Sequence, residues 1–225
     1  MLRLKNLYIG YEKKILLENI NLNISPNNLT VLIGENGSGK STLFRTLARL
    51  QKPIKGGIFF TQKGFPFGDK DIFSISNNEF AKLVSYVSTD RPRAVNLSVY
   101  DLVSTGRSPY TNWRNELREE DRSIIEEAIS LVDLERLRNS STAEISDGEL
   151  QRAVIARVLA QKTPIIILDE PTAFLDIPNK RAITQLLKKI CKENGKTIIL
   201  SSHESEVISS SDILWEIRKN SIHLV

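Results

Sequence analysis

The sequence motif that most strongly indicates chemistry is a glycine-rich stretch that ends in a lysine and a serine. Residues 34–41 read Gly-Glu-Asn-Gly-Ser-Gly-Lys-Ser and match the pattern G-x-x-x-x-G-K-[ST]. Glycines let backbone N–H groups turn inward around a phosphate chain, and Lys40 can reach the β- and γ-phosphates while the Ser41 hydroxyl ligates Mg²⁺. A turn before a capped helix is the plain alternative, but the register of these residues favours nucleotide binding.

Two carboxylates follow an apolar run. Ile165–Leu168 has the length of a buried strand, and Asp169 and Glu170 come directly after it. If this strand lies beside the phosphate loop, Asp169 would reach the Mg²⁺ shell and Glu170 would polarise the water that attacks the γ-phosphate. Two acidic residues also often follow a strand simply because it ends at the protein surface. Asp169 and Glu170 therefore indicate a catalytic site only in combination with the phosphate loop.

Two further polar residues have a structural and a chemical interpretation. His203 follows the apolar run Thr197–Ser201, and it could contact the γ-phosphate if that run is a neighbouring strand. Ser146 and Glu149 form the capping-box pattern S-x-x-E at a helix start. A capped helix start also offers free N–H groups to an anion.

The elements expected to position these residues alternate between strand and helix. Short apolar strands are expected at 29–33, 84–87, 165–169, 197–201 and 213–217, with half-exposed antiparallel strands at 2–8 and 15–24. A helix is expected from Lys40 to about Leu50, and Gly56-Gly57 is expected to end that unit before a strand at 58–61. Helical patterns fill about 98–160, so the pattern indicates an α/β core with an inserted helical lobe.

Composition narrows the class of protein. Among 225 residues, 40% are hydrophobic and 26% charged, as in an ordinary globular protein, and the single Cys191 favours a reducing compartment. No apolar run approaches the roughly 20 residues that span a bilayer, so other chains would have to cross a membrane. The net charge of +4 comes from scattered residues, so we expect no nucleic-acid partner.

Together the motifs resemble the ATPase subunit of the ABC transporter family, in that family's order and over nearly the whole chain. Residues 34–42 resemble the Walker A loop, 145–149 the signature sequence usually written LSGGQ, and 165–170 Walker B with its catalytic glutamate. Residues 173–176 are similar to the D-loop, and His203 is similar to the switch histidine.

The resemblance implies one ABC ATPase domain over residues 1–225. Its α/β P-loop core would comprise about 1–88 and 161–225, with a parallel sheet and an N-terminal antiparallel β subdomain, and a helical subdomain would be inserted at about 89–160. It also implies ATP and Mg²⁺ as cofactors, and a homodimer in which two copies face head to tail through the ATP sites.

The family's functional residues carry over as expectations. The catalytic residues would be Lys40, Glu170 and His203, and the metal ligands Ser41, Asp169 and Thr89. The nucleotide-binding residues would be Tyr11 (stacked on adenine), Gly34, Glu35, Asn36, Gly37, Ser38, Gly39, Lys40, Ser41, Thr42 and, from the partner copy, Ser146 and Gly148.

Two departures from the family pattern stand out. Thr89, followed by Asp90, occupies the position where the family has a glutamine; its hydroxyl can ligate Mg²⁺ or a water, but it is shorter. Asp147 and Glu149 replace the usual glycine and glutamine, and they would repel a γ-phosphate unless their side chains turn away.

Residues 96–103 and the Gly-Arg-Ser-Pro-Tyr of 106–110 resemble importers for iron-siderophores, haem and cobalamin. The resemblance implies polytopic permease partners, an extracytoplasmic binding protein acting indirectly, and a peripheral location at the cytoplasmic face of the inner membrane. An exposed loop with Tyr110 and Trp113 could seat a partner's coupling helix, or both aromatics could pack under their own lobe.

Three other functions stay open at this point. One is a soluble ABC ATPase outside transport, such as one that serves Fe–S cluster assembly. The second is a nucleic-acid binder, which the positive charge suggests. The third is a kinase for a small molecule, in which the Ser146 region would have no role.

Overall fold

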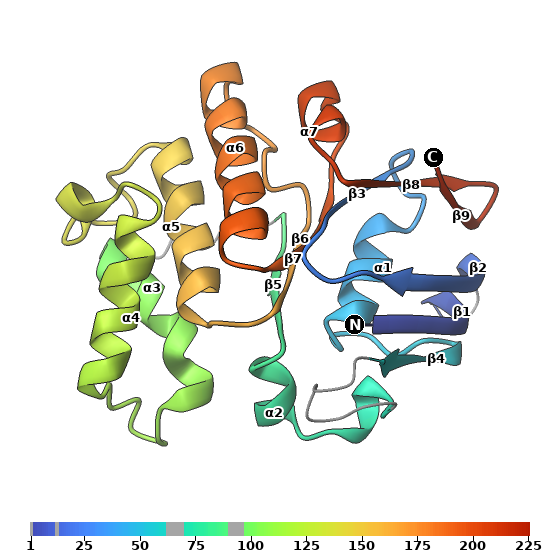
Figure 1. Ribbon diagram of the computed structural model, residues 1–225, viewed down its shortest axis with the longest axis horizontal. Helices are drawn as coiled ribbons and strands as arrows, with labels where there is room; N and C mark the ends of the chain where they lie inside the picture. The colour runs from blue at the N-terminus through green and yellow to red at the C-terminus, as the bar shows by residue number, and fades with distance from the viewer. Residues whose placement is uncertain (1, 12–13, 62–69, 90–96) are drawn as a thin grey trace.

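The computed structural model describes residues 2–11, 14–61, 70–89 and 97–225. Three N-terminal strands form an antiparallel sheet in the order β2-β1-β4, made of β1 (Leu2–Tyr11), β2 (Lys14–Ile24) and β4 (Lys55–Phe60). This sheet lies beside α1 (Lys40–Leu47), at the opposite end of the molecule from the helical region (Figure 1). The expected N-terminal antiparallel sheet is therefore present.

The central sheet has the strand order β5-β6-β7-β3-β8-β9. Its first five members are parallel and its edge strand is antiparallel: β5 (Val84–Val87), β6 (Ile165–Leu168), β7 (Thr197–Ser201), β3 (Leu29–Ile33), β8 (Ile213–Arg218) and β9 (Ser221–Leu224). The four residues of β6 are all buried, as expected for a strand covered on both faces. Because the carboxyl ends of parallel strands meet at one edge, the residues after β3, β6 and β7 come together there.

The strand that carries Asp169 does not neighbour the phosphate-loop strand. β7 lies between them, with Ile199 paired to Thr30 on one side and to Ile167 on the other. The expectation that β6 lies directly beside β3 is therefore wrong, whereas the expectation that the His203 strand neighbours β3 is confirmed. The consequence is that the end of β7, at Ser201, separates the phosphate loop from the two carboxylates.

Three helices form the helical region at one side of the central sheet: α3 (Val99–Ser104), α4 (Glu119–Ser130) and α5 (Asp147–Ala160). The remaining helices are α2 (Asn77–Ala81), α6 (Ile177–Glu193) and α7 (Ser205–Ser209), with 3-10 turns at Ile72–Ser74, Thr105–Tyr110 and Glu135–Leu137. One apolar core joins the helical region to one face of the sheet, and a second joins the other face to α1 and the antiparallel sheet. Among the described residues, no helix combines the length and the apolar character needed to span a bilayer.

Gly56 and Gly57 do not end a unit; they lie inside β4. A Cβ atom on Gly56 would lie 2.1 Å from the backbone oxygen of Asn6 in β1, and the residue has φ +86°. A pair of glycines usually interrupts a strand, but here Gly56 permits the close approach of two backbones. The strand therefore begins at Lys55, three residues earlier than expected.

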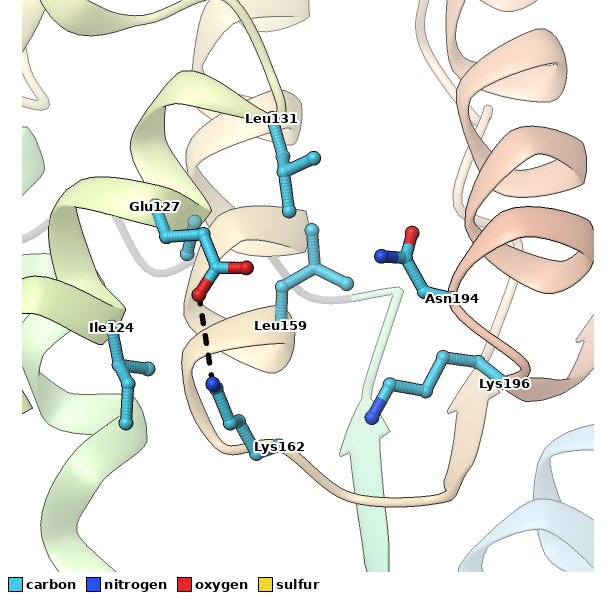
Figure 2. A pocket seen from close by; sticks show the side chains of 8 residues that line it. Ile124, Glu127, Leu131, Leu159, Lys162, Asn194 and Lys196 are labelled. Atoms are coloured by element: carbon cyan, nitrogen blue, oxygen red, sulfur yellow. Dashed lines mark ion pairs between the residues drawn. The ribbon is translucent and has the colours of Figure 1, made fainter.

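A pocket of about 190 Å³ lies where α4 and α5 meet the loop between α6 and β7 (Figure 2). Its walls are lined by Ile124, Glu127, Ala128, Leu131, Leu159, Lys162, Asn194 and Lys196. Lys162 precedes β6 and Lys196 precedes β7, so the pocket lies at the amino ends of these strands. It is therefore at the opposite edge of the sheet from Asp169 and Glu170.

Candidate nucleotide site

The phosphate loop turns between β3 and α1. Gly39 is the residue before α1 and has φ +106°, and a Cβ atom there would lie 3.3 Å from side-chain atoms of Leu16 and Leu17. Gly37 also has a left-handed φ, of +78°. These conformations favour glycine and leave the first N–H groups of α1 without a side-chain cap. The loop thus has the backbone shape that binds phosphate.

Lys40 folds back over its own loop. Its Nζ donates hydrogen bonds to the backbone oxygens of Gly34 (2.7 Å) and Glu35 (3.1 Å), and it lies 3.0 Å from Nε2 of His203. Burial lowers the pKa of Lys40, and the nearby carboxylates of Glu170 and Asp169 raise it without cancelling that effect. The structure therefore brings together the lysine, both acids and the histidine that the sequence singled out.

Ser201 holds the two acids in place. Its Oγ donates to Oδ1 of Asp169 at 2.7 Å and accepts from the backbone N–H of Glu170 at 2.9 Å. Ser201 is fully buried, and Glu170 has a left-handed φ of +48°. Sequence reasoning missed Ser201, because it lies 32 residues from Asp169 in an apolar strand and belongs to no motif.

Glu170 and His203 face each other without a hydrogen bond. Oε1 of Glu170 lies 3.6 Å from Nε2 of His203, which is too long for a hydrogen bond. Both side chains are partly exposed, so a water or a phosphate oxygen can reach them. The carboxylate is thus free to orient a water, as a general base must.

Thr89 lies next to Asp169. Its Oγ1 donates to the backbone oxygen of Asp169 at 3.2 Å, so its hydroxyl is at the edge of the site. Asp90 lies outside the described residues. The assignment of Thr89 as a metal ligand stays a prediction.

The oxygen atoms available at the site suit Mg²⁺. Ser41 is an exposed hydroxyl next to Lys40, and Asp169 supplies a buried carboxylate. No group of three or more His, Cys, Asp or Glu side chains that could hold a metal occurs in the part of the chain that the structure describes. Mg²⁺ is usually held by one or two protein oxygens together with water and phosphate oxygens, so the residues fit this ion.

The remaining residues expected to bind nucleotide differ in exposure. Glu35, Asn36 and Gly37 are exposed at the tip of the loop, and Thr42 is buried in α1. The Ser38 hydroxyl is buried, and it has no hydrogen-bond partner among the described residues. Tyr11, the last residue of β1, is 56% exposed and is accessible for stacking.

Ser146 forms the capping box expected from the sequence. Its Oγ accepts from Glu149 N (3.3 Å) and donates to Glu149 Oε2 (2.7 Å), and the Ser146 N–H donates to the same carboxylate at 2.8 Å. These hydrogen bonds lower the pKa of Glu149. The Glu149 carboxylate therefore folds back onto Ser146. An anion could approach the helix start only if this acidic side chain, which replaces the family's glutamine, is turned away in this manner.

Gly148 has a packing role that the sequence did not reveal. A Cβ atom on Gly148 would lie 2.4 Å from Oδ1 of Asn179, near the start of α6. Asp176 caps that helix by accepting from Asn179 N at 3.1 Å. The starts of α5 and α6 are therefore in direct contact. Figure 1 places α5, which follows Ser146, and α1, which begins at Lys40, on opposite sides of β6 and β7.

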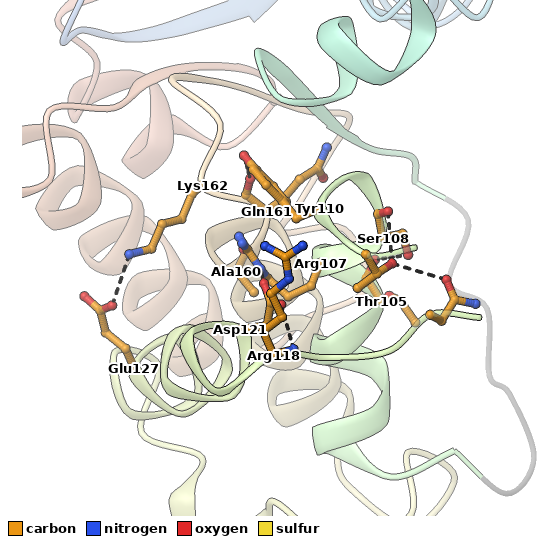
Figure 3. Close-up of polar contacts among 12 residues, drawn as sticks. Thr105, Arg107, Ser108, Tyr110, Arg118, Asp121, Glu127, Ala160, Gln161 and Lys162 are labelled. Atoms are coloured by element: carbon orange, nitrogen blue, oxygen red, sulfur yellow. Dashed lines mark hydrogen bonds and ion pairs between the residues drawn. The ribbon is translucent and has the colours of Figure 1, made fainter. Parts of the chain in front are cut away.

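The two interpretations of the Gly-Arg-Ser-Pro-Tyr segment and Trp113 each hold for one aromatic residue. Arg107 is buried; it donates from Nε to Asp121 Oδ1 at 2.9 Å and from Nη1 to the backbone oxygen of Ala160 at 2.7 Å (Figure 3). The Tyr110 ring lies 3.9 Å from the Arg107 guanidinium carbon, and its hydroxyl donates to the Gln161 backbone. Tyr110 thus packs on its own lobe, whereas Trp113 is 85% exposed.

Known proteins share this arrangement. The family model described as ABC transporter matches residues 17–173. The uncharacterized ABC transporter ATP-binding protein MJ0873 of Methanocaldococcus jannaschii is 39% identical over 207 residues, covering 92% of this chain and 69% of the relative. The probable siderophore transport system ATP-binding protein YusV of Bacillus subtilis is 36% identical over 200 residues, covering 89% of this chain and 70% of the relative.

A solved structure adds a nucleotide state. The dimeric post-hydrolysis form of the ATP-binding cassette MJ0796, bound to ADP and Pi, matches 99% of this chain and 97% of its own. The TM-score is 0.81 and the sequence identity 28%. The likeness therefore extends over both the sheets and the helical region.

Proposed function

Because this chain belongs to the ABC transporter family and is an ATP-hydrolysing subunit of it, we propose that it powers an importer for iron-siderophore, haem or cobalamin-type substrates. The observation that carries the proposal is the meeting of Lys40, Asp169, Glu170 and His203 around Ser201 at the carboxyl edge of the sheet. Each is a group that phosphoryl transfer to water needs, and they lie on segments that follow three different strands, β3, β6 and β7.

In the proposed reaction, Lys40 exchanges its two loop carbonyls for the β- and γ-phosphates. Glu170 orients the attacking water and accepts its proton, and His203 contacts the γ-phosphate from the neighbouring strand. Mg²⁺, held by Ser41, Asp169 and Thr89, would neutralise charge on the phosphates. Ser201 keeps Asp169 and Glu170 in register throughout.

Two copies would act together, facing head to tail. Within one copy, α5 and α1 lie on opposite sides of β6 and β7, so a partner copy would have to supply the second anion site. The segment around Asp176 supports such a junction, because Phe174 is 78% exposed and Ile177 64% exposed beside it. Large apolar side chains exposed together favour an interface. ATP would hold the copies together, and hydrolysis would loosen them.

The partners in the membrane would be polytopic permease subunits, with the chain peripheral at the cytoplasmic face of the inner membrane. An extracytoplasmic binding protein would act through them. Trp113 is the residue that supports this contact, since exposed tryptophan is enriched at protein interfaces. Tyr110 does not, because it is already packed on Arg107.

Iron-siderophore complexes are favoured among the three proposed substrates by the names of relatives. YusV is named for siderophore transport. The iron(3+)-hydroxamate import ATP-binding protein FhuC of Bacillus subtilis is 34% identical over 200 residues, covering 89% of this chain and 72% of the relative.

The test is reconstitution in proteoliposomes with the permease and binding protein encoded nearest to this gene. We expect ATP hydrolysis to be stimulated by binding protein loaded with a ferric siderophore, more than by haem- or cobalamin-loaded protein. Stimulation by neither siderophore, haem nor cobalamin would contradict the substrate assignment. Co-purification with Fe–S assembly proteins, and with no polytopic membrane protein, would contradict the importer assignment and favour the non-transport alternative.

A further inference from the structure

The pocket between α4, α5 and the α6–β7 loop combines two lysines with an apolar wall (Figure 2). The ammonium groups of Lys162 and Lys196 both point into it, and the amide of Asn194 is directed toward the same space. The opposite wall is aliphatic and consists of Ile124, Ala128, Leu131 and Leu159. The polar side of the pocket therefore carries two ammonium groups and the Glu127 carboxylate, and the other side is hydrocarbon.

The charges of the pocket are not balanced. Glu127 forms an ion pair with Lys162 at 3.5 Å, so this one carboxylate balances only one of the two ammonium charges. The backbone oxygen of Lys196 accepts from the Cys191 thiol at 3.1 Å, but its ammonium group makes no hydrogen bond or ion pair among the residues that the structure describes, and the residue is half-buried. Burial lowers the pKa of Lys196, the charge of Lys162 lowers it further, and Glu127 raises it only in part. Two cations that oppose each other in a half-closed pocket would be stabilised by an anion between them.

From this geometry we propose that the pocket binds a small aliphatic carboxylate anion. The carboxylate would lie between Lys162 and Lys196 and accept from Asn194, and its carbon chain would contact Leu131 and Leu159. The volume of about 190 Å³ corresponds to roughly six water molecules, so a chain of a few carbons fits. A fully hydrated ion such as inorganic phosphate would leave the aliphatic wall unused.

The position of the pocket makes it distinct from the nucleotide site. Lys162 and Lys196 precede β6 and β7, whereas Asp169 and the Ser201–His203 region follow them. The pocket walls belong to α4 and α5 on one side and to the α6–β7 loop on the other. A bound anion would therefore tie the helical region to the central sheet at a site remote from ATP.

Titration calorimetry of the full chain without nucleotide tests the proposal, with glutarate as the probe. We expect saturable binding with a Kd of roughly 1 mM or tighter. The Lys196→Met and Lys162→Met variants, which keep the aliphatic stem, should each bind glutarate roughly tenfold more weakly, as expected when one hydrogen bond to a charged group is lost. Lys52→Met, which removes an exposed lysine outside the pocket lining, should bind like the parent chain.

Three probes separate the parts of the proposal. Pentane-1,5-diol should not bind, because it lacks the charge. Phosphate that binds as tightly as glutarate would overturn the aliphatic part, and glutarate binding that Lys196→Met leaves unchanged would overturn the site. An absence of saturable glutarate binding up to about 20 mM would overturn the whole proposal. None of these readouts depends on ATP hydrolysis, so they stand or fall separately from the proposed function.

Discussion

At the scale of single residues, Glu170 is the proposed general base for hydrolysis. Its carboxylate is partly exposed and faces His203 across 3.6 Å. We expect Glu170→Gln to bind ATP normally and to hydrolyse it about 10²–10⁴-fold more slowly, the usual range for a lost general base. Single-turnover ATPase rates measure this. Glu206→Gln, which removes an exposed carboxylate paired with Arg181, is the control, and near-parental turnover of Glu170→Gln would refute the assignment.

Ser201 is a positioning residue, because it is fully buried and its hydroxyl is hydrogen bonded to Asp169 and to the backbone of Glu170. Removal of its hydroxyl in Ser201→Ala leaves the buried Asp169 carboxylate with one partner fewer. We expect a kcat lower by on the order of 10²-fold, with little change in KM, and a loss of ~1–3 kcal/mol in the free energy of unfolding.

Ser85→Ala is the matched control for Ser201→Ala. Ser85 is a buried hydroxyl that accepts from Thr163 at 2.9 Å, near the other end of the sheet. Its loss should lower the free energy of unfolding while kcat stays unchanged. If Ser85→Ala and Ser201→Ala lower kcat equally, the Ser201 effect is only structural.

The proposed catalytic residues could be selected from the sequence to the extent that they lie in local motifs. Lys40, Asp169 and Glu170 each occur within a few residues of a strand end, and the structure brings them together. Ser201 was not predictable, because its role depends on which strand lies between β6 and β3. The strand order is determined by the packing of the whole sheet, and the residues near Ser201 in the sequence do not indicate it.

At the scale of elements, the contact between α5 and α6 depends on Gly148. A methyl group there would lie 2.4 Å from the end of the Asn179 side chain, so that side chain would have to move and lose its hydrogen bond to Asp176. We expect Gly148→Ala to lower the free energy of unfolding by about 1 kcal/mol, the usual net contribution of one hydrogen bond, and to reduce ATPase turnover. Chemical denaturation and ATPase assays measure both effects.

The double variant Gly148→Ala/Asn179→Ala is the control for this contact. It removes the side chain that the new methyl group meets, while Asp176 still accepts from the backbone N–H of residue 179. Part of the lost stability should return. If the double variant is no more stable than Gly148→Ala, the contact with Asn179 does not explain the glycine.

The helical region contains a buried ion pair that makes its stability depend on pH. Burial raises the pKa of Asp121, but hydrogen bonds from the Arg118 backbone and from Arg107, with the Arg107 charge, outweigh it and lower the pKa. Because folding lowers the pKa of Asp121, its ionised carboxylate stabilises the folded state. This stabilisation is complete above the pKa of the unfolded chain, about 3.9, and is lost as the pH falls through the lower pKa of the folded chain.

We therefore expect Asp121→Asn to destabilise the protein at pH 7 by ~3–5 kcal/mol, because it leaves Arg107 buried without its partner. The variant should also show a weaker loss of stability below about pH 4 than the parent chain. Urea denaturation from pH 3 to 7 measures both. Asp133→Asn, at an exposed position, should reproduce the parent curve, and an Asp121→Asn curve of unchanged slope would contradict the assignment.

Element types were predictable because apolar runs of four or five residues and capping boxes are local signals. The capping box predicted at Ser146 is present in the structure. The start of β4 was not predictable, because a glycine such as Gly56 usually weakens or interrupts a strand. Its place in β4 depends on the close approach of the Asn6 backbone, which is distant in the sequence. The burial of Arg107 was likewise hidden, since its partner Asp121 lies in another helix.

At the scale of the whole molecule, the two proposed halves of the nucleotide site are separated within one copy. The phosphate loop precedes α1 and the Ser146 cap precedes α5, on opposite sides of the central strands. A second copy turned head to tail would join each half-site to its complement, with ATP between them. The exposed Phe174 and Ile177 would then be covered at the junction.

Ser146→Arg tests this arrangement, because it places a long side chain where the partner's nucleotide would approach. In a Glu170→Gln background, which should retain ATP, we expect ATP to convert the parent chain to a dimer and to leave the Ser146→Arg chain monomeric in size-exclusion chromatography with light scattering. Ser141→Arg, close in sequence but outside the capping box, should still dimerise. A Ser146→Arg chain that dimerises with ATP would show that the capped start of α5 is only a helix terminus. The proposed head-to-tail dimer, in which Ser146 contacts the partner's nucleotide, would then be contradicted.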